Sequence, residues 1–418
     1  MDIHTKLSGH ILVDYKAKVI DLEASQGSWL VDCQTNNKYL DCYSQFASQP
    51  LGWNHPKILG QKERLLNAAV HKIANSDMYC HEYLNFVETF ASITTDFKWH
   101  FFISGGALAV ENALKTAFDW KMQRSKKINE NKLDVIHLKE AFHGRSGYTL
   151  SLTNNGNINN PKTKWFPKFK WTRVTNPKIH FPISSDVEEL EIISLKEITK
   201  ALKKGNVAAI ILEPIQGEGG DNHFRNEYFL ELRKLANEYD ALLIFDEVQT
   251  GMGLTGKMWA YQHYDVIPDI LCFGKKTQVC GICSTDRIDE VKDNVFHVHS
   301  RINSTWGGSM VDMVRSTMFM EIIKEDNLVQ NTAVVGEYFL ECLKNLKSKK
   351  YVIDNFRGRG LMIAFDIDST DSRNELLSGI NQKMIALPCG NRSIRIRPHL
   401  TFTKEEANQA INIIQECL

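Results

Sequence analysis

The sequence predicts an α/β fold: a large domain with a mostly parallel central sheet flanked by helices, and a small α+β domain from both chain ends. Three observations predict it. Short apolar runs with little alternation recur in the middle of the 418-residue chain, as in parallel strands that are buried on both faces. Amphipathic stretches of helical length separate these runs. Neither end of the chain repeats this pattern.

The strand–helix–strand order can be followed along the middle of the chain. The runs expected to be strands are DVIHL (134–138), VAAIIL (207–212), ALLIF (241–245) and DILCF (269–273). Between the second and the third, YFLELRKLANEY (228–239) carries apolar residues at helical spacing. The alternation therefore predicts a sheet whose neighbouring strands are joined by crossover helices.

The chain ends predict a smaller unit. GSWLVDCQTNNKYLDCY (27–43) predicts a hairpin that turns at TNN, because turn residues separate two apolar runs. After residue 327 come a helical stretch, GEYFLECLKNLKS, a strand-like GLMIAFDI and the final SIRIRPHLTFTKEEANQAINIIQECL. We expect residues 1–60 and 316–418 to form the small domain together, and residues 61–315 to form the large cofactor-binding domain.

Composition excludes several classes of function. Fifty basic residues balance fifty acidic ones, so the whole chain has no electrostatic attraction to nucleic acid or to an anionic membrane. No apolar run reaches the ~18 residues that a membrane span needs. The first ten residues lack the apolar core of a secretory signal. The nine scattered cysteines suit reduced thiols, so we expect a cytoplasmic protein.

A glycine motif follows the strand ALLIF. Gly251, Gly253 and Gly256 spell G-x-G-x-x-G, which taken alone suggests a dinucleotide site and an NAD-dependent oxidoreductase. The glycines begin five residues past the apolar run, however, and Asp246 and Glu247 between them would repel a pyrophosphate. We interpret the segment as a glycine-rich loop near an active site.

A C-x-x-C pair, Cys280 to Cys283, is the other isolated motif. Such a pair can be a redox couple or half of a zinc site. No second pair at suitable spacing completes a metal site, so we expect no metal.

Asp246 and Glu247 end a strand that is otherwise entirely apolar. Ligands of open α/β sheets lie at the carboxyl ends of the strands, and a buried carboxylate needs a cationic partner there. The protonated ring nitrogen of pyridoxal 5'-phosphate is such a partner. That cofactor also needs a lysine for a Schiff base, and Lys275 follows the strand DILCF by two residues.

The cofactor phosphate and ring need partners too. Ser104-Gly105-Gly106-Ala107 opens a long amphipathic helix, whose N-terminal amides form an anion site. Phe142 or His143, after the strand DVIHL, could stack on one ring face, and Val248 could cover the other. Together these residues predict a pyridoxal-phosphate site.

From about residue 27 to the C-terminus the chain resembles the class III aminotransferases, pyridoxal-phosphate enzymes of fold type I. Within that class it is most similar to the L-lysine 6-transaminase (lysine ε-aminotransferase) branch. The resemblance depends on FISGGALAVENALKTAFDWK, EAFHGRSGYTLSLTN, EPIQGEGGDNHFRNEYF, DALLIFDEVQTGMGLTGKMWAY, PDILCFGKKTQVCG, RINSTWGGSMVDMVR and IRIRPHLT. Ser104 and the segment CGICSTDR depart from the pattern, and both are expected near the cofactor.

The resemblance implies a role for each cofactor residue. Lys275, chosen over Lys276 because it directly follows the glycine, forms the Schiff base and moves the proton. Asp246 pairs with the ring nitrogen, and Gln249 contacts the ring hydroxyl. The remaining implied contacts are Gly106 and Ala107 to the phosphate, Phe142 on the ring, and Thr305 to the phosphate of a second subunit in a homodimer.

The resemblance also implies the reaction, in which L-lysine and 2-oxoglutarate give 2-aminoadipate 6-semialdehyde and L-glutamate. Arg145 resembles the binder of the distal carboxylate and Arg395 the binder of the proximal one, with Glu218 as a switch that masks Arg395. Two further residues expected at the substrate are Glu213, beside the substrate or supporting a residue that is, and Asn303, orienting the substrate or the phosphate loop. Ornithine, 4-aminobutyrate or a diamine remain alternative donors.

Overall fold

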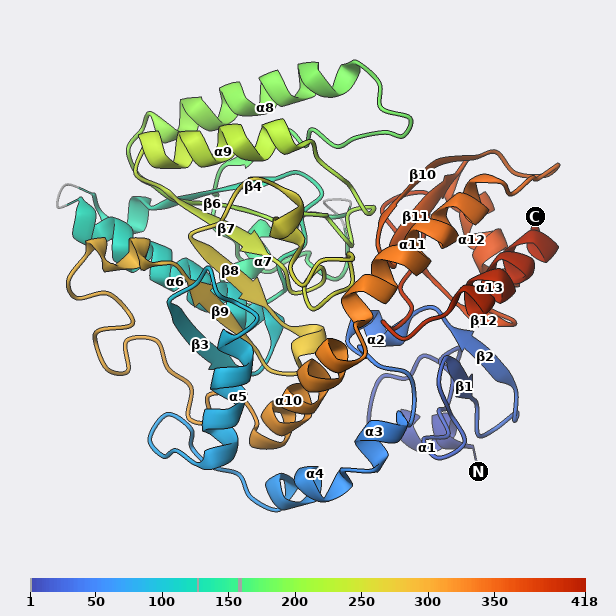
Figure 1. The fold of residues 1–418 in the computed structure, drawn as a ribbon. Coiled ribbons are helices and arrows are strands. Elements are labelled where there is room, and N and C mark those ends of the chain that lie inside the picture. The colour runs from blue at the N-terminus through green and yellow to red at the C-terminus, as the bar shows by residue number, and fades with distance from the viewer. Residues whose placement is uncertain (1, 126–127, 157–159) are drawn as a thin grey trace.

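The computed structural model of the protein describes residues 2–125, 128–156 and 160–418. A seven-stranded sheet lies at its centre, in the order β3-β9-β8-β7-β6-β4-β5 (Figure 1). Neighbouring strands are parallel, except that β9 runs antiparallel to both β8 and β3. The strands are β3 (Trp99–Ile103), β4 (Asp134–Leu138), β5 (Arg173–Val174), β6 (Val207–Leu212), β7 (Leu242–Asp246), β8 (Ile270–Phe273) and β9 (Cys280–Ser284). The mostly parallel sheet confirms the predicted fold class.

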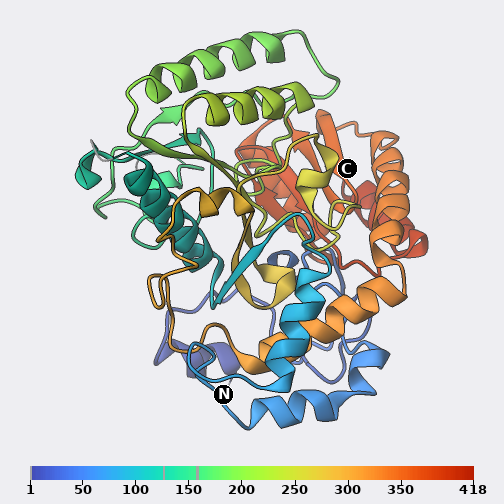
Figure 2. The same cartoon turned by 60° about the vertical axis from the view of Figure 1, so that its left-hand side comes forward.

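Helices cover both faces of this sheet, which explains why its strands are continuously apolar. Helices α8 (Asp186–Leu202) and α9 (Asn226–Glu238) lie on one side of the sheet and α6 (Gly106–Arg124) on the other (Figures 1 and 2). Along β6, Ile210 belongs to the same buried cluster as Phe229 of α9, whereas Ile211 belongs to the cluster that contains Leu114 of α6. Successive side chains of a strand point to opposite faces, so an alternating sequence would leave one helix layer without apolar contacts.

The remaining helices of the N-terminal three quarters are shorter, apart from α10. They are α1 (Ile3–Ser8), α2 (Ser44–Ala47), α3 (Pro56–Leu59), α4 (Lys62–Ala69), α5 (His81–Ala91), α7 (Thr149–Leu152) and α10 (Met310–Glu325), with single 3-10 turns at 130–132, 260–263, 275–277 and 286–290. Within the described ranges, none of the helices combines the length and the apolar character that a membrane crossing requires.

Two smaller sheets bring the chain ends together. The predicted hairpin is confirmed, since β1 (Trp29–Val31) pairs antiparallel with β2 (Lys38–Asp41). The C-terminal β12 (Met384–Ile385) then pairs with β2. The other sheet, of order β10-β11-β14-β13, consists of β10 (Ile353–Arg359), β11 (Met362–Ile367), β14 (Ser393–Ile396) and β13 (Leu387–Cys389), and its helices are α11 (Leu328–Lys344), α12 (Thr370–Ile380) and α13 (Lys404–Cys417). The exact boundaries at residues 60 and 315 stay a prediction.

The sheet places four predicted strand ends at one edge. Strands β4, β6, β7 and β8 match the predicted runs to within one residue and are mutually parallel neighbours. Their carboxyl ends therefore meet at the same edge. The residues that follow them are the ones that the sequence singled out.

Candidate active site

A cavity of about 820 Å³ opens at this edge of the sheet. It is lined by segments that follow β4, β6, β7 and β8 and by the first residues of α6. Eleven of the predicted residues line it: Gly106, Ala107, Phe142, His143, Arg145, Glu213, Glu218, Asp246, Val248, Gln249 and Lys275. Side chains from five separate parts of the chain thus meet in one place.

Asp246 is the last residue of β7 and its carboxylate is buried. Nδ1 of His143 lies 2.8 Å from Oδ2 of Asp246, and the Val248 amide donates to Oδ1 at 3.1 Å. Both contacts hold the carboxylate in one orientation. Nε2 of His143 is buried and has no hydrogen-bond partner among the described residues. The arrangement presents a fixed negative charge to the cavity.

Glu247, the next residue, faces the opposite way. It is fully buried, and it accepts hydrogen bonds from the amides of Ala260 (2.6 Å) and Tyr261 (2.7 Å) and from the Thr250 hydroxyl (3.0 Å). Burial raises the pKa of Glu247 to about 7. This carboxyl group holds the loop after β7, so the two adjacent acids have different tasks.

Lys275 and Lys276 are adjacent in sequence, but their side chains lie in different surroundings. Lys275 lines the cavity, and its backbone adopts the left-handed region with φ 55°. Burial and the nearby Arg395 guanidinium lower the pKa of Lys275 to about 8. Lys276 is 1% exposed and donates instead to the carbonyls of Gln249 (2.8 Å) and Ala47 (3.1 Å). The geometry supports Lys275 as the reactive amine.

The start of α6 is suited to an anion. Its N-cap, Gly105, has φ +106°, and neither an acidic side chain in the first turn nor a side-chain cap occupies the terminal amides. A Cβ on Gly106 would lie 2.9 Å from Cγ1 of Val248, so only glycine allows this close packing. Exposed amides and the helix dipole together favour a phosphate here.

Glu213 supports residues that line the cavity. Its carboxyl group accepts the amides of Phe142 and Gly217, each at 3.0 Å. Burial raises its pKa to about 7, and Asp246 adds to this effect. Glu213 therefore holds the Phe142 segment and the loop after β6 in place.

Another residue of the lining, Gln249, has an unused acceptor: its Oε1 has no hydrogen-bond partner within the described part of the chain.

An ion pair forms at Glu218, one of the residues that line the cavity. Nη2 of Arg395, on β14, lies 2.6 Å from Oε1 of Glu218, although 177 residues separate them. The Arg395 side chain is 4% exposed and that of Glu218 28% exposed. On the other side, the Arg145 guanidinium lies 5.6 Å from the centre of the Phe142 ring. Arg145 thus lines the cavity itself, whereas Arg395 is paired with the lining residue Glu218.

Three predicted residues do not line the cavity of their own chain: Arg395, which pairs with the lining residue Glu218, and Asn303 and Thr305. Asn303 and Thr305 belong to the segment before α10, where the Thr305 carbonyl accepts a hydrogen bond from Ser76 at 3.2 Å. Gly105 and Cys280, which belong to motifs that the sequence singled out, also line the cavity. Residues without such a signal complete the lining: Gln45, Phe46, Ser48, Gly144, Lys162 and Gln278. Gln45 and Phe46 lie in a turn with φ 55° and 58°, a conformation that no sequence signal indicates.

The two isolated motifs have structural explanations. The Gly251–Gly256 loop precedes a 3-10 turn rather than a helix, and it is largely buried. A Cβ on Gly256 would lie 2.9 Å from that of Ala333 on α11, so the loop packs against the C-terminal unit and does not fit a dinucleotide. Cys280 and Cys283 lie three residues apart on β9 and therefore on opposite faces, which prevents a disulfide between them.

Comparison with known proteins places this geometry in context. The Aminotransferase class-III family model matches residues 12–418. The L-lysine-epsilon aminotransferase of Streptomyces clavuligerus is 46% identical over 428 aligned residues, covering 99% of this chain and 93% of the relative. The human mitochondrial 4-aminobutyrate aminotransferase is 31% identical, covering 95% and 84%. The structure of a lysine aminotransferase from M. tuberculosis in the internal aldimine form is 45% identical, with a TM-score of 0.95 over 100% of this chain and 98% of that one.

Proposed function

The chain belongs to the class III aminotransferases, and from this we propose that it transfers the ε-amino group of L-lysine to 2-oxoglutarate. The products are 2-aminoadipate 6-semialdehyde and L-glutamate. The observation that carries the proposal is the ion pair of Arg395 with Glu218, a residue that lines the same cavity as Lys275 and Asp246. The similar proteins named as lysine ε-aminotransferases support the choice of donor.

Pyridoxal 5'-phosphate is the cofactor, and the residues present fit it. Asp246, with its two hydrogen-bond donors, would hold a protonated ring nitrogen, and the first turn of α6 would hold the phosphate. The unpartnered Oε1 of Gln249 is free to accept a hydrogen bond from the ring hydroxyl. When bound, the cofactor supplies a pyridinium ring that withdraws electrons from the reacting substrate carbon.

Lys275 carries the proton in this reaction. With a pKa of about 8, Lys275 has a far larger uncharged fraction near neutral pH than an ordinary lysine, so Nζ can accept a proton from the substrate carbon and return it. The side chain projects from a left-handed backbone position directly after β8. Burial and the positive charge of Arg395 keep the amine basic enough to accept the proton and acidic enough to release it.

Substrate recognition uses the two arginines. The carboxylate of L-lysine lies far from its ε-amine, and Arg145, which lines the cavity, would bind it with the fork of its guanidinium. Glu218 meanwhile neutralises Arg395, which would otherwise favour an α-carboxylate beside the reacting carbon. For 2-oxoglutarate, Glu218 rotates away and Arg395 binds the proximal carboxylate. Phe142 would cover one ring face and Val248 the other.

We also propose an obligate homodimer in the cytoplasm. Asn303 and Thr305 lie outside the cavity of their own chain, so Thr305 would reach the phosphate of a second subunit and Asn303 would help to orient that loop. The nine cysteines are all free in the described residues, which supports a reducing compartment.

Isotope transfer tests the proposed regiochemistry directly. The purified enzyme is incubated with 2-oxoglutarate and L-lysine that carries ¹⁵N at either the ε- or the α-position. The proposal predicts labelled L-glutamate from ε-labelled lysine alone, together with the semialdehyde. Label arriving from the α-position would contradict it. Parallel incubations with ornithine, 4-aminobutyrate and a diamine measure the preference among donors.

A further inference from the structure

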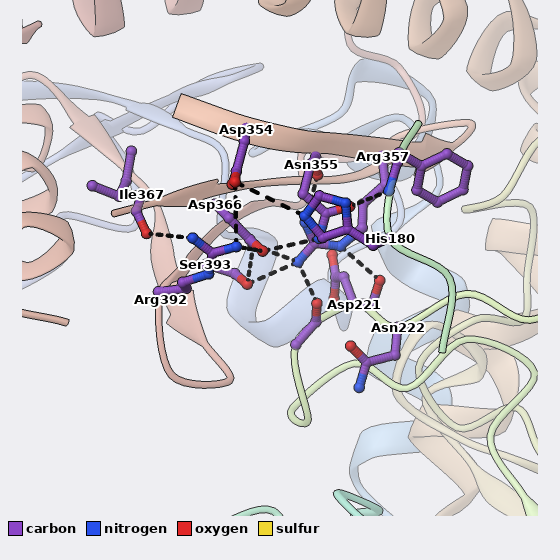
Figure 3. Close-up of polar contacts among 12 residues, drawn as sticks. His180, Asp221, Asn222, Asp354, Asn355, Arg357, Asp366, Ile367, Arg392 and Ser393 are labelled. Atoms are coloured by element: carbon purple, nitrogen blue, oxygen red, sulfur yellow. Dashed lines mark hydrogen bonds and ion pairs between the residues drawn. The ribbon is translucent and has the colours of Figure 1, made fainter. Parts of the chain in front are cut away.

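A buried polar cluster joins the small C-terminal sheet to the loop at 216–222 that carries Glu218. Figure 3 shows Arg357 of β10 between two sets of partners, Asp366 and Ser393 on the C-terminal sheet and Asp221 on the loop. The reaction proposed above assigns no task to Arg357. Its buried charge therefore needs a separate explanation.

Arg357 donates most of its hydrogen bonds to backbone carbonyls. Its Nη2 donates to the Gly220 carbonyl at 2.5 Å, and its Nε to the Asp221 carbonyl at 3.0 Å. The same guanidinium pairs with the Asp366 carboxylate at 2.8 Å, and its side chain is 2% exposed. It thus fixes the main chain two and three residues after Glu218 to the C-terminal sheet.

Other contacts hold the same loop on either side. The Gly390 amide donates to the carbonyl of Glu218 itself at 3.0 Å. Asp221 forms a fully buried ion pair with Arg397. A Cβ on Gly219 would lie only 2.2 Å from the Glu140 carbonyl, so the backbone has no room to shift toward the large domain. The loop backbone is clamped.

The Glu218–Arg395 pair contrasts with this clamp. The Glu218 side chain is 28% exposed, whereas those of Asp221 and Arg397 are 1% and 2% exposed. Among the four residues of these two ion pairs, Glu218 is the one that lines the cavity, so its carboxylate is the group that can leave its partner. The loop therefore carries one fixed ion pair and one that can open, three residues apart.

We propose that Arg357 is a positioning residue for amine specificity: by anchoring the Gly220 and Asp221 carbonyls, it holds the main chain so that the Glu218 side chain alone opens and closes over Arg395. This inference rests on the proposed function, because it concerns the choice between an ε-amine and an α-amine. Without the anchor, Glu218 would mask Arg395 less completely. Substrates with an α-carboxylate beside the reacting amine would then gain relative to L-lysine.

The test compares two amine donors in single half-reactions of the cofactor-loaded enzyme. The quantity measured is kcat/KM for L-lysine divided by kcat/KM for L-glutamate. We expect Arg357→Met to lower this ratio roughly 10-fold, about the factor that one hydrogen bond to a charged group contributes. Arg357→Lys keeps the charge without the fork and should restore part of it.

Arg373 provides a matched control. It is also buried and donates to the Ser393 carbonyl at 3.1 Å, but its hydrogen bonds do not include the 216–222 loop. Arg373→Met should leave the ratio unchanged. The pair Arg357→Met with Asp366→Asn removes both charges of the buried ion pair, so it tests the same anchor if the single variant does not fold.

A double-mutant cycle separates positioning from general stability. If Arg357 acts through Glu218, adding Arg357→Met to Glu218→Ala should change the ratio by no more than about 2-fold. Equal losses for both donors, or effects that add in the double variant, would overturn the inference. If the wild-type enzyme shows no reaction at the ε-amine, the proposed function itself fails, which is a different outcome from an unchanged ratio in the variants.

Discussion

Asp246→Asn separates the charge of the strand-end carboxylate from its shape. The amide keeps one oxygen for the Val248 amide, which lies 3.1 Å from Oδ1, and its NH2 group takes the place of Oδ2, 2.8 Å from Nδ1 of His143, where the other imidazole tautomer accepts a hydrogen bond. The side chain of this 5%-exposed residue therefore keeps its size and shape. What is lost is the negative charge that would stabilise a protonated ring nitrogen. The substitution therefore removes the charge while the side-chain volume is kept.

The size of the effect follows from burial. Two unit charges about 4 Å apart interact by about 4 kcal/mol at the effective dielectric constant of a partly buried protein site. If that stabilisation is realised as charge develops on the ring, the rate falls roughly 10³-fold, since each ~1.4 kcal/mol is tenfold. Asp246 is buried at the sheet edge, where solvent cannot replace the lost charge.

Stopped-flow absorbance of the bound cofactor near ~420 nm measures the half-reaction with L-lysine. Glu247→Gln is the control, because this neighbouring acid binds the amides of Ala260 and Tyr261 instead of facing the cavity. We expect the control to react within a few-fold of wild type. The reasoning is refuted if Asp246→Asn reacts at nearly the wild-type rate, or if both variants are slowed alike.

Three further predictions concern neighbouring residues. Glu218→Ala should reduce the preference for the ε-amine of L-lysine over α-amines, measured as the ratio of kcat/KM values, because Arg395 loses its partner; an unchanged ratio excludes the switch. Lys276→Met should lower the free energy of unfolding by about 1–3 kcal/mol, since two buried carbonyls lose their donor, while cofactor attachment persists; urea unfolding measures this. The rate of cofactor incorporation into the apoenzyme should rise with pH and level off above about 8, because only uncharged Lys275 reacts; a midpoint near that of an ordinary lysine, about 10.4, contradicts it.

The fold was predictable because strands that are buried on both faces appear in the sequence as short, mainly apolar runs. The runs at 134–138 and 207–212 coincide with β4 and β6, since a strand between two helix layers is mainly apolar on both of its faces. Asp246 and Lys275 were found for the same reason, as polar residues directly after such runs. A hairpin at 27–43 was also readable, because turn residues separate its two strands.

The remaining parts of the site depend on contacts between distant segments. Gln45 and Phe46 reach the cavity from a left-handed turn in the N-terminal segment, which no periodicity indicates. Glu218 and Arg395 could be named from the family resemblance, but their 2.6 Å contact across 177 residues needed the structure. No sequence pattern indicates the anchoring contacts of Arg357, since its partners are mainly backbone carbonyls.

Borohydride reduction of the native holoenzyme tests the central claim most directly. Reduction makes a Schiff base between a lysine and the cofactor permanent, and mass spectrometry of the peptides then identifies the lysine. The account predicts one modified residue, Lys275, and none at Lys276, whose amine is bound to two carbonyls. Recovery of unmodified Lys275, or of the cofactor on any other lysine, would contradict it.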